Sequence, residues 1–176
     1  NTSWLTRTSW ATTTCARMSA APETAAPAWR AAYDARVARL RAQYDAIPAG
    51  APVRLAKRTS NLFRQRAESA TPGLDVADFD GVLHVDPVAR TAEVQGMTTY
   101  EHLVEATLPH GLMPLCVPQL KTITLGGAVT GLGIESTSFS WGLPHESVIE
   151  MDVLTGDGRR LDGADVLMRD GKVAGV

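Results

Sequence analysis

Residues 125–138 read LGGAVTGLGIESTS, and WGLPH follows at residues 141–145. Glycine admits backbone conformations with positive φ and lets the main chain approach a ligand closely. Consecutive backbone N–H groups in such a turn form a concavity that binds phosphate oxygens. The segment therefore predicts a site for an anionic ligand, held by main chain and hydroxyls rather than by lysines. The glycines and hydroxyls that form it are Gly126, Gly127, Gly131, Gly133, Gly142, Thr122, Thr124, Thr130, Ser136 and Ser138.

Two common nucleotide-binding motifs are absent from this segment. A Walker A loop needs Gly-Lys followed by Ser or Thr after a four-residue gap, and the segment has no such run. The dinucleotide fingerprint G-x-G-x-x-G also fails, because Ser136 stands where the third glycine would be. Spacing alone leaves two interpretations open, a nucleotide site or tight turns that pack small residues closely.

The whole run from Leu125 to Ser138, with residues 141–145 and Glu150, resembles the FAD-binding domain of the vanillyl-alcohol oxidase/p-cresol methylhydroxylase (PCMH) type. Within that family it is most similar to the Δ24-sterol reductase-like branch, which carries a Gly-x-Gly-Ile-Glu-Ser run. The resemblance extends from about Val53 to about Leu161. It implies an α+β fold in which two α+β subdomains hold FAD between them. No histidine stands in the expected first loop, so the resemblance implies non-covalent FAD.

The resemblance also implies where the cofactor lies. Residues 124–127 would contact the FAD pyrophosphate through backbone N–H groups, and residues 131–138 would line the ribityl chain and the flavin ring. Residues 57–61, KRTSN, stand at the first pyrophosphate loop but depart from its usual Pro-x-Gly-Gly-Gly-x-Ser form. Arg58 there either supplies a charge or is a surface residue at a strand end. The expected cofactor-binding residues are Arg58, Thr59, Ser60, Asn61, Thr122, Thr124, Leu125, Gly126, Gly127, Gly131, Gly133, Glu135, Ser136, Ser138, Gly142 and His145.

Three side chains in or near the motif carry separate expectations. His145 is the histidine that lies inside the motif, so we expect it at the site. A carboxylate beside the flavin must be paired or shifted in pKa, so Glu135 is either such a group or a turn-capping residue. Cys116 is expected to pack as a small buried group. No catalytic residue and no metal ligand is predicted. The remaining histidines, on a strand or flanking a helix, are His84, His102 and His110.

Periodicity predicts the elements around the motif. One helical face appears between Pro27 and Pro48, with apolar residues three or four positions apart. A second helix is expected to open at Thr98, which has capping-box spacing to Glu101. Short strands are expected at residues 53–57, 81–85, 91–95 and 147–154, with hairpin turns at 86–87 and 156–158. The first helical face consists of Trp29, Tyr33, Val37, Leu40, Tyr44 and Ile47.

The predicted organisation has four parts. Residues 1–22 are expected to be upstream sequence or a disordered tail, and residues 23–48 an amphipathic N-terminal helix. Residues 53–165 would be a partial PCMH-type FAD-binding domain, followed by an atypical tail at 166–176. Because domains of this family continue beyond this point, the sequence predicts a C-terminally truncated member.

Composition and charge narrow the function classes. The 176 residues are 44% hydrophobic and 20% charged, with a net charge of −2, as in a folded soluble chain. Two cysteines exclude a disulfide scaffold, and no apolar run is long enough for a membrane span. Residues 30–70 hold nine basic and three acidic residues, whereas residues 71–176 hold six basic and fifteen acidic residues. This asymmetry fits either an anion-binding segment or two solvated surfaces of opposite charge. The basic segment lacks the interleaved aromatic residues that are typical of proteins that bind single-stranded nucleic acids.

The predicted function is that of an FAD-dependent oxidoreductase, or its FAD-binding part. A hydride would pass between a small-molecule or lipid-like substrate and the flavin. The chain is expected in the cytoplasm, with no nucleic-acid partner, and a homo-oligomer is left open. The alternative is a non-catalytic remnant or binding module of the same fold.

Overall fold

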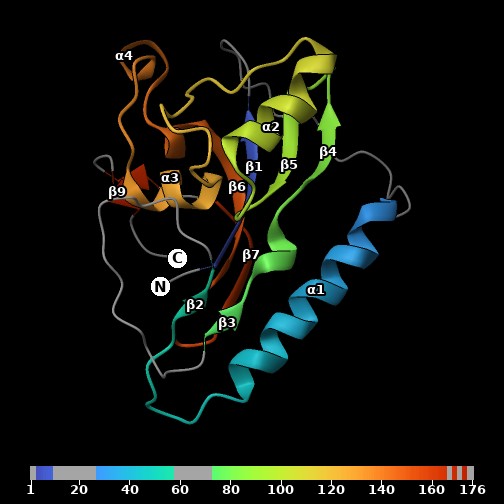
Figure 1. Ribbon diagram of the computed structural model, residues 1–176, viewed down its shortest axis with the longest axis vertical. Helices are drawn as coiled ribbons and strands as arrows, with labels where there is room; N and C mark the ends of the chain where they lie inside the picture. Colours follow the sequence, from blue (N-terminus) through green and yellow to red (C-terminus); the bar gives the residue numbers. More distant parts are fainter. Residues whose placement is uncertain (1–2, 10–26, 58–72, 166–167, 170–171, 174–176) are drawn as a thin grey trace.

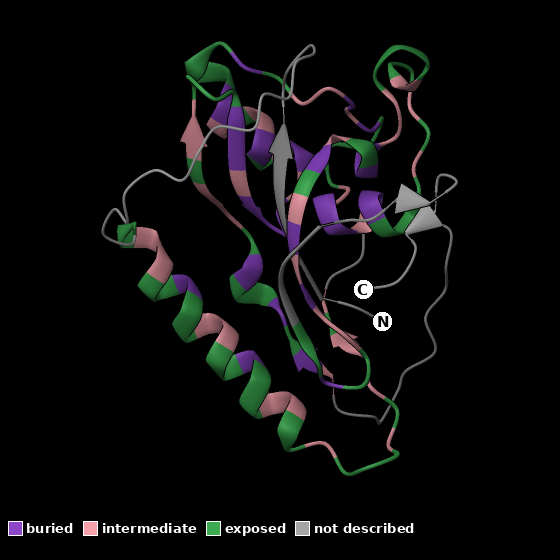
Figure 2. Ribbon diagram, turned by 180° about the vertical axis from the view of Figure 1, so that it is seen from behind, coloured by how far each residue is buried: buried purple, intermediate pink, exposed green. Residues whose placement is uncertain are grey.

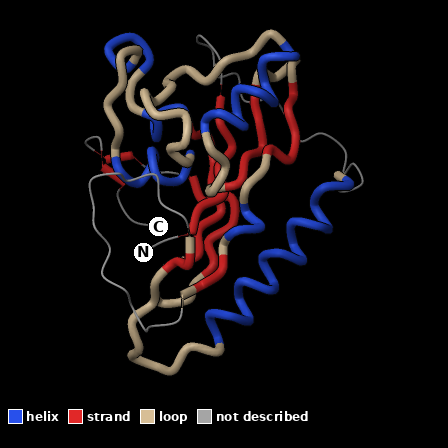
Figure 3. Tube along the Cα trace, in the orientation of Figure 1, coloured by secondary structure: helices blue, strands red, loops and turns tan. Residues whose placement is uncertain are grey.

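A five-stranded antiparallel sheet with helices on both faces forms the centre of the molecule (Figures 1 and 3). The computed structural model describes residues 3–9, 27–57, 73–165, 168–169 and 172–173. Helices and strands mix as the predicted α+β class requires. The strands lie in the order β4-β5-β1-β6-β7. Their bounds are β4 Val82–Asp86, β5 Thr91–Gln95, β1 Ser3–Ser9, β6 Val148–Leu154 and β7 Arg160–Asp165.

Two hairpins form the outer parts of this sheet, as the sequence predicts. In the β4–β5 turn the Asp86 carboxylate accepts hydrogen bonds from the backbone N–H groups of Val88 and Ala89, at 2.9 and 2.8 Å. In the β6–β7 turn the Thr155 hydroxyl accepts from the Arg159 N–H at 3.0 Å. These local side-chain bonds help to close each turn.

The central strand differs from the sequence expectation. Ser3–Ser9, which the sequence analysis assigns to a tail, form β1 and pair in antiparallel fashion with β5 on one side and β6 on the other. Thr6, for example, stands opposite Val94 and Met151. Threonine and tryptophan favour strands, but their alternation here shows no clear apolar face. Pairing with the edges of β5 and β6 therefore determines this strand more than its own sequence pattern does.

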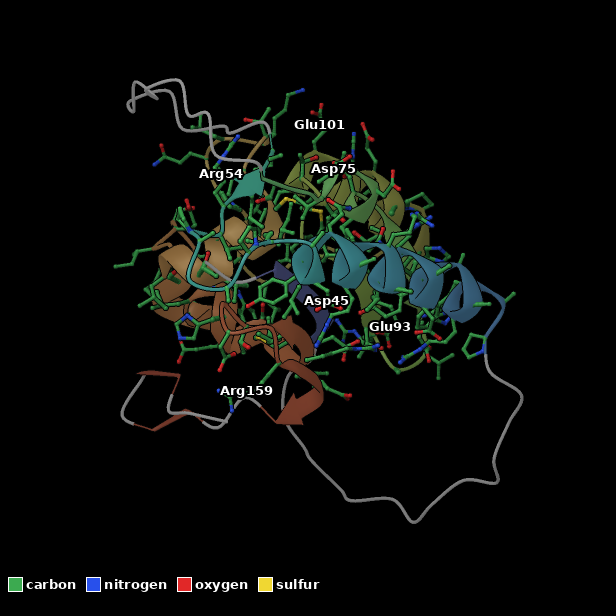
Figure 4. All side chains as sticks on the ribbon, turned by 90° about the horizontal axis from the view of Figure 1, so that it is seen from below. Asp45, Arg54, Asp75, Glu93, Glu101 and Arg159 are labelled. Carbon is green, nitrogen blue, oxygen red and sulfur yellow. The ribbon has the colours of Figure 1, made fainter. Side chains whose placement is uncertain are left out.

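Helix α1, Ala28–Asp45, covers one face of the sheet and confirms the predicted helical face. Its buried Tyr33 and Leu40 form a core cluster with Leu74, Val76 and Phe79. The Tyr33 hydroxyl donates a hydrogen bond to Asp152 of β6 at 2.8 Å. Figure 4 shows α1 from below, with Glu93 beside its N-terminal half. The arginines on its outer side pair with carboxylates, as Arg30–Asp34, Arg39–Asp78 and Arg41–Asp45.

Burial of two tyrosines makes the fold sensitive to alkaline pH. Desolvation, followed by the hydrogen bond and charge of Asp152, raises the pKa of Tyr33 well above its ordinary value of 10.0. Desolvation also raises the pKa of Tyr100, with smaller contributions from Cys116 and Glu135. The unfolded chain therefore releases these protons at lower pH than the native state. The free energy of unfolding is expected to fall as pH rises above about 10.

The Tyr33→Phe variant tests this linkage. It should lower stability near neutral pH by about 1–2 kcal/mol, because the bond to the Asp152 carboxylate is lost. It should also show a shallower decline above about pH 10 than the parent chain. Tyr44→Phe is the control, since that hydroxyl donates to the exposed carbonyl of Gly156 at 3.0 Å. Urea unfolding at several pH values gives the comparison, and equal alkaline slopes in the parent and Tyr33→Phe would contradict it.

Helix α2, Tyr100–Thr107, has its N-cap one residue later than the sequence predicts. Thr99 caps it, accepting from the His102 N–H at 3.3 Å. The prediction that Thr98 and Glu101 form a capping box is wrong. Thr98 is buried, and its hydroxyl accepts from the N–H of Gly81 and donates to the carbonyl of that residue, at 2.8 and 2.9 Å. Glu101 forms an ion pair with Lys121 instead.

The second core lies on the opposite face, beneath α2 and α3 (Figure 2). Side chains alternate along β6, so Met151 and Val153 enter this core while Asp152 and Leu154 face α1. Two short ladders lie apart from the main sheet, β2–β3 in parallel and β8–β9 in antiparallel orientation. The remaining bounds are β2 Leu55–Ala56, β3 Leu74–Asp75, β8 Met168–Arg169, β9 Lys172–Val173, α3 Leu125–Gly131, α4 Ser138–Trp141, η1 Ala77–Phe79, η2 Leu108–His110 and η3 Pro144–Ser147.

Candidate functional site

The glycine-rich segment begins as a helix rather than as an open turn. Thr124 is the N-cap of α3, and its hydroxyl accepts from the Gly127 N–H at 3.2 Å. Three glycines in a seven-residue helix are unfavourable by roughly 1 kcal/mol each relative to alanine. Burial of Leu125, Ala128 and Val129 against the sheet offsets this cost. Tertiary packing therefore determines the helix, which local propensity does not predict.

The backbone donors at the start of α3 are already engaged within the chain. The Leu125 N–H donates to the Thr98 carbonyl at 2.8 Å, and the Gly126 N–H donates to the Gly96 carbonyl at 2.9 Å. With Gly127 bound to Thr124, three of the four N–H groups at residues 124–127 expected to hold the pyrophosphate have protein partners. These three donors are therefore not free for a phosphate in this structure.

Two of the predicted site glycines are required by the chain itself. A Cβ on Gly126 would stand 2.7 Å from the Gly96 carbonyl oxygen, so only glycine allows α3 this close to the β5–α2 turn. Gly142 has φ +77°, in the left-handed region that favours glycine. A Cβ there would also meet the Glu146 carboxylate at 2.6 Å, where that carboxylate accepts from the Leu143 N–H.

Gly131 and Gly133 are different, because nothing in the described chain requires them. A Cβ on Gly131 would have no described neighbour within 4 Å, and the residue is exposed. At Gly133 the nearest atoms are 3.8 Å away, an ordinary van der Waals distance. Neither residue has positive φ. The open space above Gly131 is what a closely approaching ligand would need.

The loop that follows presents an apolar and nearly uncharged surface. Phe139 is 91% exposed and Ile134 is 78% exposed, far more than is usual for such large apolar side chains. Leu132 and Trp141 are also exposed, and Ser136 adds an exposed hydroxyl. Such a surface suits a flat, largely apolar ring system, as the isoalloxazine ring is.

The polar residues of the motif point elsewhere. The Glu135 carboxylate accepts from the Gln119 N–H at 3.2 Å, and Ser138 Oγ accepts from the Glu135 N–H at 3.0 Å. Cys116 is buried, as predicted, with its Sγ 3.3 Å from Ser138 Oγ. Of the partner residues on the 115–119 segment, the sequence singles out Cys116 but not Leu115 or Gln119. Pro114 just before the segment and Pro118 within it are the signal that marks it as a shaped loop.

His145 lies on η3 and is only 2% exposed. Its Nδ1 atom is buried and has no hydrogen-bond partner among the residues that the structure describes. An unpaired buried ring nitrogen is unfavourable, and native proteins usually satisfy such groups with protein, water or ligand. Such an orphaned atom fits a position that a bound group completes.

Several predicted site residues are not brought together with these. Arg58, Thr59, Ser60 and Asn61 lie outside the described residues. Thr122 is exposed on the turn before α3. Pockets of about 210 and 240 Å³ lie beside α1, and no predicted cofactor residue lines either of these two. Within the described ranges, no three histidine, cysteine or acidic side chains gather as a metal site would require. No described helix has the length and apolarity to cross a bilayer.

A family model described as an FAD binding domain matches residues 37–164. The chain belongs to this family. FAD is therefore its cofactor, and the resemblance drawn from the 125–150 segment is confirmed. The match begins inside α1, so the second half of that helix lies within the family region.

Curated relatives agree with this membership. Delta(24)-sterol reductase of Pisum sativum is 28% identical over 85 residues, which is 48% of this chain and 15% of that protein. Cytokinin dehydrogenase 5 of Arabidopsis thaliana is 32% identical over 74 residues, 42% of this chain and 14% of that protein. Cytokinin dehydrogenase 7 of Oryza sativa subsp. japonica is 31% identical over 100 residues, with shares of 53% and 19%. No solved structure matches the chain.

Proposed function

We propose that this chain binds FAD non-covalently, with the flavin over the Gly131–Gly133 end of α3 and the adjoining loop, and orients it for hydride transfer. The observation that carries this proposal is the open space above Gly131, where no described atom lies within 4 Å of a Cβ. Two α+β subdomains would hold the cofactor between them, and the main sheet with α2 and α3 would belong to one of them. The buried Nδ1 of His145 lies on η3, which packs against α3, and has no hydrogen-bond partner among the described residues.

Bound FAD would supply the redox chemistry by accepting or donating a hydride on its isoalloxazine ring. The residues of this chain would bind FAD, orient it and shield it from water. Ile134, Phe139 and Trp141 would exclude water from the face on which a substrate approaches. Their apolar character, and relatives named for a sterol reductase and for cytokinin dehydrogenases, favour a small-molecule or lipid-like substrate.

The pyrophosphate would be held elsewhere than at the first turn of α3. The N–H groups of Leu125, Gly126 and Gly127 already have partners. Arg58 and its neighbours, predicted for the first pyrophosphate loop, stay candidates for that role. The side chain of Arg58 offers the charge that the start of α3 lacks.

The test is to titrate the purified full chain with FAD and record the visible absorption bands of bound flavin and the quenching of flavin fluorescence. We expect saturable binding of FAD, and reduction of the bound flavin by a competent substrate under anaerobic conditions. Saturable binding without reduction by any sterol, cytokinin or related small molecule would favour the non-catalytic binding module. No binding at all would contradict the proposal.

A further inference from the structure

The motif run Glu135–Ser138 is tied to the segment before α3 by its polar side chains. Glu135 Oε2 accepts a hydrogen bond from the Gln119 N–H at 3.2 Å. The Thr137 hydroxyl donates to the Leu115 carbonyl at 3.0 Å. Two side chains of the motif thus reach two backbone groups of one neighbouring segment, although 16 and 22 residues separate the partners in the sequence.

Ser138 adds a third connection and closes the turn. Its Oγ accepts from the Glu135 N–H at 3.0 Å, while its own N–H donates to the Glu135 carbonyl at 2.9 Å. The same Oγ lies 3.3 Å from the Sγ of buried Cys116, within hydrogen-bond distance for sulfur. We name these residues the loop clamp: Leu115, Cys116, Gln119, Glu135, Thr137 and Ser138.

The loop clamp sorts the motif into an inner and an outer side. Its polar groups bond to the 115–119 segment and to one another, whereas Ile134 and Phe139, which flank it in sequence, are turned to solvent. Because exposed apolar side chains gain nothing from solvent in this orientation, these side-chain bonds contribute to holding the loop. A loop ordered before binding also avoids part of the entropy cost of ordering it on the ligand.

We propose that the loop clamp is a positioning device that fixes the flavin-facing loop 131–141, and that Glu135 acts in it as a hydrogen-bond acceptor. On this assignment the carboxylate charge is not the working feature of Glu135. This inference rests on the proposed function, because the loop is there assigned to the flavin. It gives the Glu-Ser-Thr-Ser part of the motif a role in the chain itself, separate from any contact with the cofactor.

The test compares Glu135→Gln with Glu135→Ala. Glutamine keeps an oxygen that accepts from the Gln119 N–H but removes the charge, whereas alanine removes both. We expect Glu135→Gln to retain FAD affinity within about twofold and to leave the flavin reduction potential unchanged. Glu135→Ala should weaken FAD binding roughly fivefold, the effect of one lost hydrogen bond. A potential shifted in Glu135→Gln, or an affinity loss equal to that of alanine, would overturn the acceptor role.

A second pair of variants makes the same comparison at the sulfur of Cys116. Cys116→Ser keeps a hydrogen-bonding partner for Ser138, and Cys116→Ala removes it. Cys116→Ser should match the parent chain, and Cys116→Ala should behave like Glu135→Ala. Equal behaviour of the two variants would count against this arm of the clamp.

Hydrogen exchange of the FAD-free full chain separates the clamp from the proposed function. Amides of residues 131–141 should exchange at least threefold faster in Glu135→Ala than in the parent and in Glu135→Gln, since net loss of one hydrogen bond is felt locally. Unchanged exchange would overturn the clamp even if FAD binds. Faster exchange in a chain that does not bind FAD would support the clamp while refuting the proposed function.

Discussion

Deletion of residues 1–9 is expected to abolish the cooperative unfolding transition. These residues include β1, which pairs with β5 and β6 and joins the two hairpins into one sheet. Without β1 the facing edges of β5 and β6 would lose their backbone partners, and each buried unpaired group costs about 1–3 kcal/mol. Several such losses exceed the roughly 5–15 kcal/mol by which a domain is stable. Circular dichroism during urea unfolding would record the change.

A matched pair of point variants tests the same strand without shortening the chain. Thr6→Pro removes one ladder N–H in the middle of β1, whereas Thr6→Ala keeps it. The proline should lower the free energy of unfolding by about 2–4 kcal/mol, the sum of a lost bond and an unsatisfied carbonyl, and alanine by under about 1 kcal/mol. If residues 1–9 were a tail, the deletion and both substitutions would leave the transition unchanged.

The elements that the sequence predicted correctly have their signals within a few residues. The three- and four-residue spacing of apolar residues within α1 predicts its buried face. An alternating stretch next to the turn that contains Asp86 predicts β5. Strand β1 could not be predicted this way. Its place is determined by two distant strand edges, which no local pattern of Ser3–Ser9 encodes.

The site shows the same division between local and distant causes. The motif identified the family and the cofactor, because a long run of specific residues carries that information. It could not distinguish the two kinds of glycine. Whether Gly126 meets a backbone carbonyl depends on Gly96, thirty positions earlier. The space at Gly131 is open because no other described segment of the chain packs against it. Likewise, the partner of Glu135 is a backbone N–H of another segment.

The two kinds of glycine give the sharpest test of the cofactor site. Gly126→Ala places a methyl group 2.7 Å from the Gly96 carbonyl oxygen, a contact that requires the backbone to shift. We expect it to destabilise the fold by about 1–3 kcal/mol, as overpacking does. Gly131→Leu adds a larger side chain where a Cβ meets nothing within 4 Å. Leucine also favours the helix over glycine, so stability should be unchanged or higher by up to about 1 kcal/mol.

FAD affinity should follow the opposite order. If the flavin lies over Gly131, the leucine side chain occupies the space of the ring, and binding should weaken at least tenfold, which corresponds to about 1.4 kcal/mol or more. Gly126→Ala should bind FAD with little change at a temperature where it remains folded, because Gly126 and its N–H serve the packing of α3 on the β5–α2 turn. Thermal unfolding and FAD titration of the two variants separate these effects. If Gly131→Leu binds FAD as tightly as the parent, the flavin does not lie at this end of α3. If Gly126→Ala is folded but no longer binds FAD, the pyrophosphate is bound at the start of α3 after all.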